Sequence, residues 1–214
     1  AIHGQSTVRV GEYEIDFSGP YEKLSMYESI NKYTGVDVSE MDEEALRQIC
    51  KNLGIDIDET MGRGKLIDEL FSEKVEAHLI QPTYITDYPI EMTPLAKKHR
   101  SKEGLVERFE LFVMGKEIAN AYSELNDPID QRQRFEEQIL LANRGDEEAM
   151  AMDEDFLRAL EYGMPPTSGL GIGIDRLVML MTNQSTIQEV LFFPQMRPEK
   201  KAKVATLEDF VAIG

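Results

Sequence analysis

The pattern of apolar and polar positions divides the chain into short strand-like runs and amphipathic helices. An alternating run near the start predicts a hairpin that turns at Gly11. The next pattern predicts a helix from the N-cap Ser25 to Gly35, with Glu28 completing a capping box. Two further helical patterns follow within residues 39–79, which we interpret as a helical insertion between strands with a packing role.

The second half of the chain continues with strands and helices in alternation. Two strands are predicted on either side of a two-residue turn at Met114-Gly115. Asp127 and Pro128 are typical of the N-cap and first position of a helix, which closes at Gly145. Another helix follows, and a glycine-rich strand then runs into a last helix. Hairpins with helices on their flanks predict an α+β fold, an antiparallel sheet backed by helices.

The predicted hairpin carries two glutamates on one face. With a two-residue turn, Phe112 pairs with Glu117 and Glu110 pairs with Ala119. Glu110 and Glu117 then become diagonal neighbours, about 7–8 Å apart. Carboxylates so close repel each other unless a cation lies between them. Mg²⁺ prefers one or two carboxylates plus substrate phosphate oxygens, so the hairpin suits a metal that bridges to a nucleotide.

The same strand continues with polar residues where an ordinary half-buried strand has apolar ones. Strict alternation places Asn120, Tyr122 and Glu124 on the face opposite Glu117. One bulged residue, either Ile118 or Ala119, would bring all of these side chains to one face, and we predict that bulge. The alternative is a solvent-facing hairpin whose polar stripe has no role in binding.

The stretch SGLGIGIDRLVMLM indicates a strand with one bare face. Its glycines at 169, 171 and 173 leave room for a flat ring or another chain, with tight strand packing as the alternative. Arg176 follows at the start of a helix, where it adds charge to an anion-binding terminus. The stretch is neither a dinucleotide-binding fingerprint, because Ile174 replaces its last glycine, nor a P-loop.

Composition narrows the function classes. The formal net charge of −17 repels phosphate backbones, so a nucleic-acid partner would be gripped mainly elsewhere. One basic stretch, Lys97 to Lys102, is interpreted as a solvated loop. The single cysteine, Cys50, excludes an internal disulfide and favours a reducing compartment, which we take to be the cytoplasm. We expect no signal peptide and no membrane span.

These motifs resemble a known family. ERFELFVMGKEIANAYSELNDPIDQRQRFEEQ is similar to the metal and lysine strands of class II lysyl-tRNA synthetases, and EYGMPPTSGLGIGIDRLVMLMTNQSTIQEVLFFPQMRP is similar to their motif 3. The stretch DYPIEMTPLAKKHR also fits, and the resemblance covers the chain except its last fifteen residues. It implies the class II synthetase fold, ATP-driven activation of lysine to lysyl-adenylate, and transfer of lysine to the 3′ end of tRNA(Lys).

The resemblance also implies roles for individual residues. Glu110 and Glu117 would hold Mg²⁺ against ATP. The lysine pocket would be lined by Glu117, Asn120, Tyr122, Glu124 and Gly171, with Glu124 pairing the ε-ammonium. ATP would be bound by Glu110, Glu117, Gly173, Ile174, Asp175 and Arg176. Of these, Arg176 would be the catalytic residue, packed on adenine near the terminal phosphates.

Parts of the family pattern are missing from this chain. Motifs 1 and 2 and the N-terminal anticodon-binding barrel are absent, so we expect residues 1–214 to be the C-terminal portion of a longer, homodimeric protein, and nearly inactive alone. Two alternatives remain open. One is a lysyl-transfer paralogue that modifies a protein such as an elongation factor, and the other is a non-catalytic binding module derived from a synthetase.

Overall fold

The protein is described by a computed structural model, which covers residues 3–146 and 149–195. A five-stranded sheet forms its centre, in the order β3-β4-β5-β6-β7. Three of the four pairings are antiparallel, and β3 with β4 is the parallel exception. The strands of this sheet are β3 Glu22–Ser25, β4 Thr83–Thr86, β5 Arg108–Val113, β6 Lys116–Ser123 and β7 Ser168–Ile172. The predicted α+β class is confirmed.

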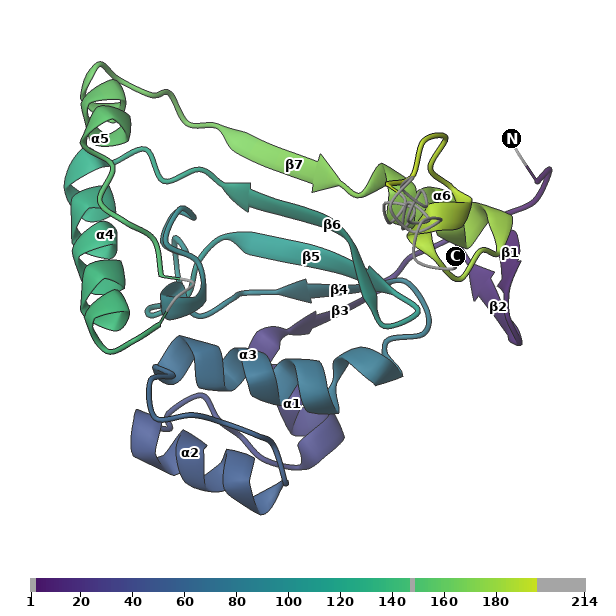
Figure 1. Ribbon diagram of the computed structural model, residues 1–214, viewed down its shortest axis with the longest axis horizontal. Helices are drawn as coiled ribbons and strands as arrows, with labels where there is room; N and C mark the ends of the chain where they lie inside the picture. The colour runs from purple at the N-terminus through teal and green to yellow at the C-terminus, as the bar shows by residue number, and fades with distance from the viewer. Residues whose placement is uncertain (1–2, 147–148, 196–214) are drawn as a thin grey trace, which may run out of the picture.

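Helices surround this sheet on three sides (Figure 1). Helices α1 to α3 lie together beside the β3 and β4 edge, α4 and α5 stand at one end, and α6 lies at the other end with the small hairpin β1-β2. The helices are α1 Met26–Thr34, α2 Glu43–Asn52, α3 Arg63–Lys74, α4 Pro128–Asn143, α5 Glu154–Glu161 and α6 Ile174–Thr182. The hairpin strands are β1 Thr7–Val10 and β2 Tyr13–Asp16, and the short 3₁₀ turns are η1 Glu76–His78, η2 Ile90–Met92 and η3 Ile187–Glu189.

The helix ends follow the capping residues that the sequence indicated. Ser25 accepts from the backbone N–H of Glu28, whose carboxylate accepts from the backbone N–H of Ser25, as in a capping box. Gly35 closes α1 in the left-handed conformation, at φ 73°. Asp127 caps α4, whose first residue is Pro128. These predictions are therefore confirmed.

The segment 39–79 forms part of a crossover. Parallel strands cannot be joined by a tight turn, and here α1, α2 and α3 make the connection from β3 to β4. The second helical pattern of this segment spans residues 65–80 and predicts a helix to its end, but α3 ends at Lys74 and the chain continues as the 3₁₀ turn η1, so the helix ends earlier than predicted. That this segment is an insertion stays a prediction, whereas its packing role is visible in the core.

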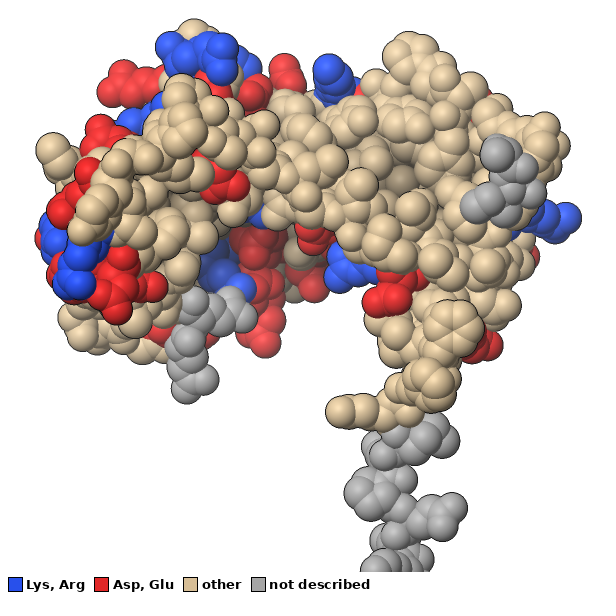
Figure 2. Space-filling model, turned by 90° about the horizontal axis from the view of Figure 1, so that it is seen from above, with Lys and Arg blue, Asp and Glu red and all other residues tan. Residues whose placement is uncertain are grey.

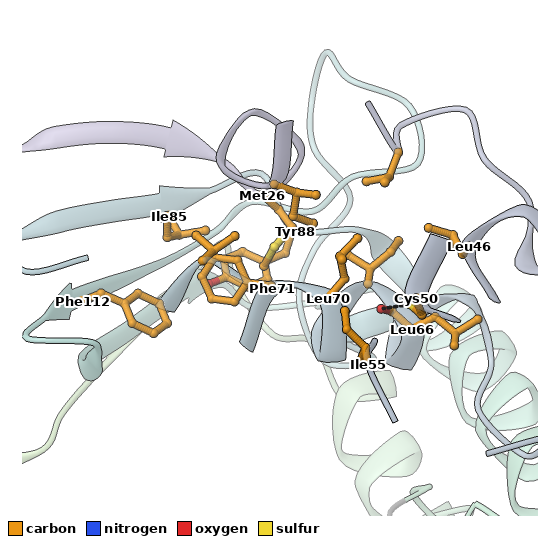
Figure 3. Close-up of a cluster of buried hydrophobic side chains, with 14 of the residues drawn as sticks. Met26, Leu46, Cys50, Ile55, Leu66, Leu70, Phe71, Ile85, Tyr88 and Phe112 are labelled. Atoms are coloured by element: carbon orange, nitrogen blue, oxygen red, sulfur yellow. Dashed lines mark hydrogen bonds between the residues drawn. The ribbon is translucent and has the colours of Figure 1, made fainter. Parts of the chain in front are cut away.

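The main core lies between these helices and one face of the sheet. Figure 3 shows Phe71 of α3 directed toward Ile85 and Phe112 of the strands, with Leu66 and Leu70 along the same helix. The rings of Phe71 and Phe112 meet edge-on with their centroids 5.4 Å apart. A second, smaller cluster on the opposite face joins the β1-β2 hairpin to α6 through Ile15, Val113, Ile118 and Leu180. The sheet is thus anchored on both faces.

The turn between β5 and β6 is the two-residue turn that the sequence predicted. Val113 pairs with Lys116, and Met114 and Gly115 both have positive φ, at 55° and 67°. Positive φ at both central residues is the mark of the tight turn that matches strand twist. Within residues 3–146 and 149–195, no helix is both long and apolar enough to cross a membrane.

Candidate functional site

A β-bulge in β6 brings the polar side chains of the hairpin to one face. Phe112 lies opposite Glu117, but Leu111 lies opposite Ala119, so Ile118 is the extra residue on its strand. Ile118 and Ala119 are both buried in succession, which a regular strand with one open face would not show. The bulge prediction is confirmed.

The bulge also corrects one predicted pairing. Glu110 lies opposite Asn120, not Ala119, because the extra residue shifts the register by one position. Residues two apart share a face, so Glu117, Asn120 and Tyr122 now point to the same side as Glu110. The alternative of a hairpin exposed to solvent on this face is wrong at Glu110, which keeps only 8% of its surface exposed.

Glu110 is held by two neighbours. One carboxylate oxygen, Oε2, accepts a hydrogen bond of 2.7 Å from the Tyr88 hydroxyl, and the other forms an ion pair with the Arg108 guanidinium. The same guanidinium lies over the Tyr88 ring, 4.6 Å from its centroid. Burial raises the pKa of Tyr88 well above its usual value, and the charge of Glu110 adds to this effect. Tyr88 therefore remains a hydroxyl donor, and the position of the Glu110 carboxylate is set before any ligand arrives.

Glu117 meets Arg176 just past the C-terminal end of the glycine strand β7. The Arg176 Nη1 donates to the backbone carbonyl of Glu117 at 2.6 Å and lies 3.6 Å from its carboxylate. Burial raises the pKa of the Glu117 carboxyl, and the charge of Glu110 raises it further, while Arg176 and Arg108 act in the opposite direction. The structure thus brings together Glu110, Glu117 and Arg176, three residues that the sequence assigned to one site.

Two more carboxylates reach the same space from the helical layer. Figure 2 shows acidic side chains gathered in a recess between the two ends of the molecule. Asp68 of α3 and Glu76 of η1 line a cleft of about 640 Å³ together with Glu110, Glu117 and Arg176. The sequence analysis missed Asp68 and Glu76, because it read their segment as packing alone.

The pKa values of Asp68 and Glu76 are both raised, because the two carboxyls are buried close to other acids. Burial raises the pKa of Asp68, and Lys65 opposes that increase. Burial also raises the pKa of Glu76; the hydrogen bond from Ser72 opposes it, and the charges of Asp68, Glu110 and Glu117 add to it. A cation in this cleft would relieve the repulsion that these carboxylates exert on one another.

The donor set suits a magnesium ion that arrives with a nucleotide. Among the described residues, no three Asp, Glu, His or Cys side chains lie close enough together to hold a metal ion by themselves. Mg²⁺ takes one or two carboxylates when substrate phosphates complete its shell. Glu110 and Glu117 therefore fit a nucleotide-bound Mg²⁺ and do not form a metal centre made of protein alone.

The other end of the same face holds a carboxylate without a cation. Glu124 follows β6 directly and is half-buried, with its backbone N–H bonded to Thr167 and its backbone bridged to Ala96. Within the described residues, no side chain donates a hydrogen bond to its carboxylate or forms an ion pair with it. Burial raises the pKa of the Tyr122 hydroxyl, and the charge of Glu124 adds to this increase. The Glu124 carboxylate is thus available to pair with a positively charged ligand.

Asn120 adds a second unsatisfied group. Its Oδ1 is buried and has no hydrogen-bond partner in the structure. A buried acceptor without a partner costs about 1–3 kcal/mol, so a ligand that donates to Asn120 Oδ1 would recover that cost. The face between Glu110 and Glu124 therefore offers one carboxylate and one amide oxygen to a ligand with N–H donors.

The glycine face of β7 lies beside these residues. Gly169 and Gly171 lie opposite Tyr122 and Asn120 and share their face. A Cβ at Gly171 would meet no atom closer than 3.9 Å, and one at Gly173 none closer than 3.6 Å, so protein packing does not require glycine at either position. At these two positions, this supports room for a ligand over tight strand packing, the alternative raised by the sequence.

The remaining predicted residues stand at the start of α6. Gly173 is its N-cap and donates its N–H to the Ile118 carbonyl at 2.8 Å. Ile174 and Asp175 form the first turn and are exposed, with Ile174 at 62%. In the described part of the chain, neither forms a hydrogen bond or ion pair with Glu110 or Glu117, so their ATP role stays a prediction.

The loop of residues 97–102 supports the site from outside. Arg100 forms a bidentate pair with Glu107, with Nε–Oε1 and Nη2–Oε2 distances of 2.5 and 3.0 Å. Glu107 also accepts from the Ser123 hydroxyl at 2.7 Å, next to Glu124. The hydrogen bond from Arg100, and then that from Ser123, lowers the pKa of Glu107 to about 2. The stretch is a largely exposed loop, as predicted, and its basic side chains also pair with protein acids.

Comparison with known proteins places this geometry in a family. Residues 3–197 match the family model described as tRNA synthetases class II (D, K and N). A protein named lysine–tRNA ligase from Porphyromonas gingivalis is 63% identical over 213 residues, which is the whole of this chain and 37% of that protein. That alignment also includes the last fifteen residues, which the resemblance had left out; residues 196–214 lie outside those that the structure describes.

Two further relatives agree. Proteins of the same name from Christiangramia forsetii and Azobacteroides pseudotrichonymphae are 62% and 60% identical, over 94% and 93% of this chain. The chain spans 36–40% of the length of these relatives. The family match covers most of the chain, and the bulged acidic hairpin and glycine strand described above lie inside it. The chain therefore belongs to the class II tRNA synthetases of the D, K and N group.

Proposed function

We propose that the chain is the C-terminal part of the catalytic domain of a lysine–tRNA ligase. The longer protein would activate lysine with ATP to lysyl-adenylate and pyrophosphate, then transfer lysine to the 3′-terminal ribose of tRNA(Lys). The observation that carries the proposal is the half-buried Glu124 carboxylate, to which no described side chain offers a cation. The names of relatives 60–63% identical to the chain support the same substrate.

Recognition of lysine would rest on charge and on unsatisfied acceptors. Glu124 would pair with the ε-ammonium, and the buried Asn120 Oδ1 would accept from the ligand. Tyr122 and Gly171 would line the pocket, with Glu117 at its other end. A substrate without the ammonium would leave the Glu124 charge unpaired, which allows strong discrimination against it.

ATP would bind along the acidic hairpin and the glycine strand. Glu110 and Glu117 would hold Mg²⁺, which when bound neutralises charge on the phosphates. Tyr88 and Arg108 keep Glu110 oriented for that task. Arg176 would stand by the nucleotide as the catalytic residue, with Gly173, Ile174 and Asp175 on the same side. Catalysis would then consist of positioning and charge neutralisation, with little acid–base chemistry.

The rest of the protein would supply what this chain lacks. The family's motifs 1 and 2 would complete the ATP site and the dimer interface, and an anticodon-binding domain would bring tRNA(Lys). We expect the longer protein to be a cytoplasmic homodimer. Residues 1–214 alone would be nearly inactive, because half of the ATP site would be missing.

Lysine-dependent ATP–pyrophosphate exchange by the longer protein tests the proposal. Lysine should support exchange, and arginine and ornithine should support it much more weakly. Equal rates with all three would contradict the proposed selectivity for lysine. Exchange at a similar rate by residues 1–214 alone would contradict the fragment interpretation. Transfer of activated lysine to a protein instead of tRNA would favour the paralogue, and ATP binding without exchange would favour a non-catalytic module.

A further inference from the structure

Gly169 lies directly against the carboxylate of Glu124. A Cβ built on Gly169 would come within 2.5 Å of Glu124 Oε1, a separation that real Cβ atoms essentially never show. No other residue would be approached this closely, since the next atom is Cδ of the same glutamate at 3.7 Å. The space of the missing side chain is therefore filled by this one carboxylate.

Backbone geometry does not explain this glycine. Gly169 lies inside β7, in regular register opposite Tyr122, and it is absent from the glycines with positive φ. Any residue could adopt its backbone conformation, and glycine weakens a strand by removing a packing side chain. The neighbouring Gly171 shares the same face, but a Cβ there would meet nothing closer than 3.9 Å. Of these two glycines on one strand face, Gly169 is the one whose Cβ space is occupied by a protein side chain.

We infer that Gly169 is a positioning residue, which sets where the Glu124 carboxylate stands and thereby the fit of the lysine ammonium. This rests on the proposed function, in which Glu124 is the counter-ion of lysine. A side chain at 169 displaces the carboxylate from β7, because the glutamate is flexible and the strand is not. The strand keeps its place, and the carboxylate loses the position that matches the length of lysine.

The direct experiment substitutes Gly169→Ala in the longer protein. The KM for lysine should rise about 10- to 100-fold, which is the loss expected when a hydrogen bond to a charged group is misplaced. The preference for lysine over ornithine should fall. The KM for ATP and the melting temperature should stay near those of the unsubstituted protein, because the added methyl displaces only the end of a flexible side chain. An unchanged KM for lysine, or a G169A protein that fails to fold, would overturn the inference.

A double-mutant cycle with Glu124→Ala isolates the contact. Removing the glutamate removes the atoms that the new methyl would meet, so G169A should cause no further rise in KM for lysine in the E124A background. A second rise of similar size there would show that Gly169 acts on the ligand directly, and would overturn the positioning role.

The position of the carboxylate can also be read without any substrate. In the longer protein without substrate, the ¹³C resonance of the Glu124 carboxyl should move in G169A and stay in place in Gly171→Ala, the matched addition of a methyl to the same strand face. Equal movement in both variants would overturn the inference. This measurement separates the two claims: a moved resonance in a protein without lysine-dependent exchange leaves the positioning role standing and rejects the proposed function.

Discussion

The two ends of the polar sheet face differ in how their charges are satisfied. At the first, the metal end, the Glu110 carboxylate is held by Arg108 and Tyr88. At the second, the lysine end, Glu124 has no cation among the described residues, and Asn120 Oδ1 has no donor. The first arrangement stabilises the fold, whereas the second leaves interactions to be made by a ligand. The same sheet face thus combines a carboxylate held by protein side chains, Glu110, with two groups left free to bind a ligand, Glu124 and Asn120.

The largest expected effect comes from breaking the metal end. Glu110→Gln leaves the Arg108 guanidinium without its counter-charge in a mostly buried site, so the free energy of unfolding should fall by about 3 kcal/mol. Urea denaturation of residues 1–214 measures it. Glu103→Gln, in the exposed loop before β5, is the matched control and should leave stability unchanged. Equal small effects of both variants would contradict the scaffold role.

A smaller loss is expected from Tyr88→Phe. It removes only the hydroxyl that donates to Glu110, a hydrogen bond to a charged group worth about 1.5–3 kcal/mol. Tyr162→Phe removes the same hydroxyl from a side chain that is 88% exposed and should change nothing. Thermal unfolding of the two variants side by side checks this, and matching melting temperatures would show that the hydroxyl contributes nothing to the scaffold.

The stability contributed by Glu107, whose carboxylate pairs with Arg100 behind the lysine end, should depend on pH. The pKa of Glu107 in the folded chain is lowered to about 2 from an ordinary value of 4.5. A lowered carboxyl pKa stabilises the fold above the ordinary value, and this contribution disappears as pH falls from 4.5 toward 2. The stability difference between the unsubstituted chain and Glu107→Gln should therefore be largest above pH 4.5 and shrink below it. A difference that stays constant with pH would rule out the ion-paired state.

The smallest effect on stability is expected at Glu124 itself. Its carboxylate forms no ion pair with a described side chain, so Glu124→Gln should change the free energy of unfolding by no more than about 0.5 kcal/mol. In the longer protein, the same substitution should lower kcat/KM for lysine by about 100-fold, because a buried ion pair with the substrate is lost. A large loss of stability with unchanged lysine kinetics would show that Glu124 has a structural role and does not bind the substrate.

The local features of this site could be predicted from the sequence. The tight turn at Met114-Gly115 follows from residue type and spacing. The bulge near Ile118 follows from a conflict, because strict alternation would separate Glu117 from Asn120, and one extra residue resolves it. Both arguments need only neighbouring positions on two paired strands.

Contacts between distant elements could not be predicted in this way. Tyr88 lies in a stretch broken by prolines, so its approach to Glu110 depends on how that irregular segment folds over the sheet. Asp68 reaches the acidic cleft because α3 packs on the strands through Phe71, and helical periodicity identifies the buried side of a helix without showing which acids stand at its border. Gly169 was noted as part of a bare strand face, but its partner was visible only in three dimensions.

The tight turn between β5 and β6 also affects the order of folding. Glu110 and Glu117 are separated by seven positions (117 − 110), and hairpins of this kind form within about 1–10 μs. Glu124 and Gly169 are separated by 45 positions (169 − 124), so their contact must wait until α4 and α5 have closed the intervening chain. The acid pair is thus brought together by a local hairpin, whereas the contact between Glu124 and Gly169 depends on the longer chain between them.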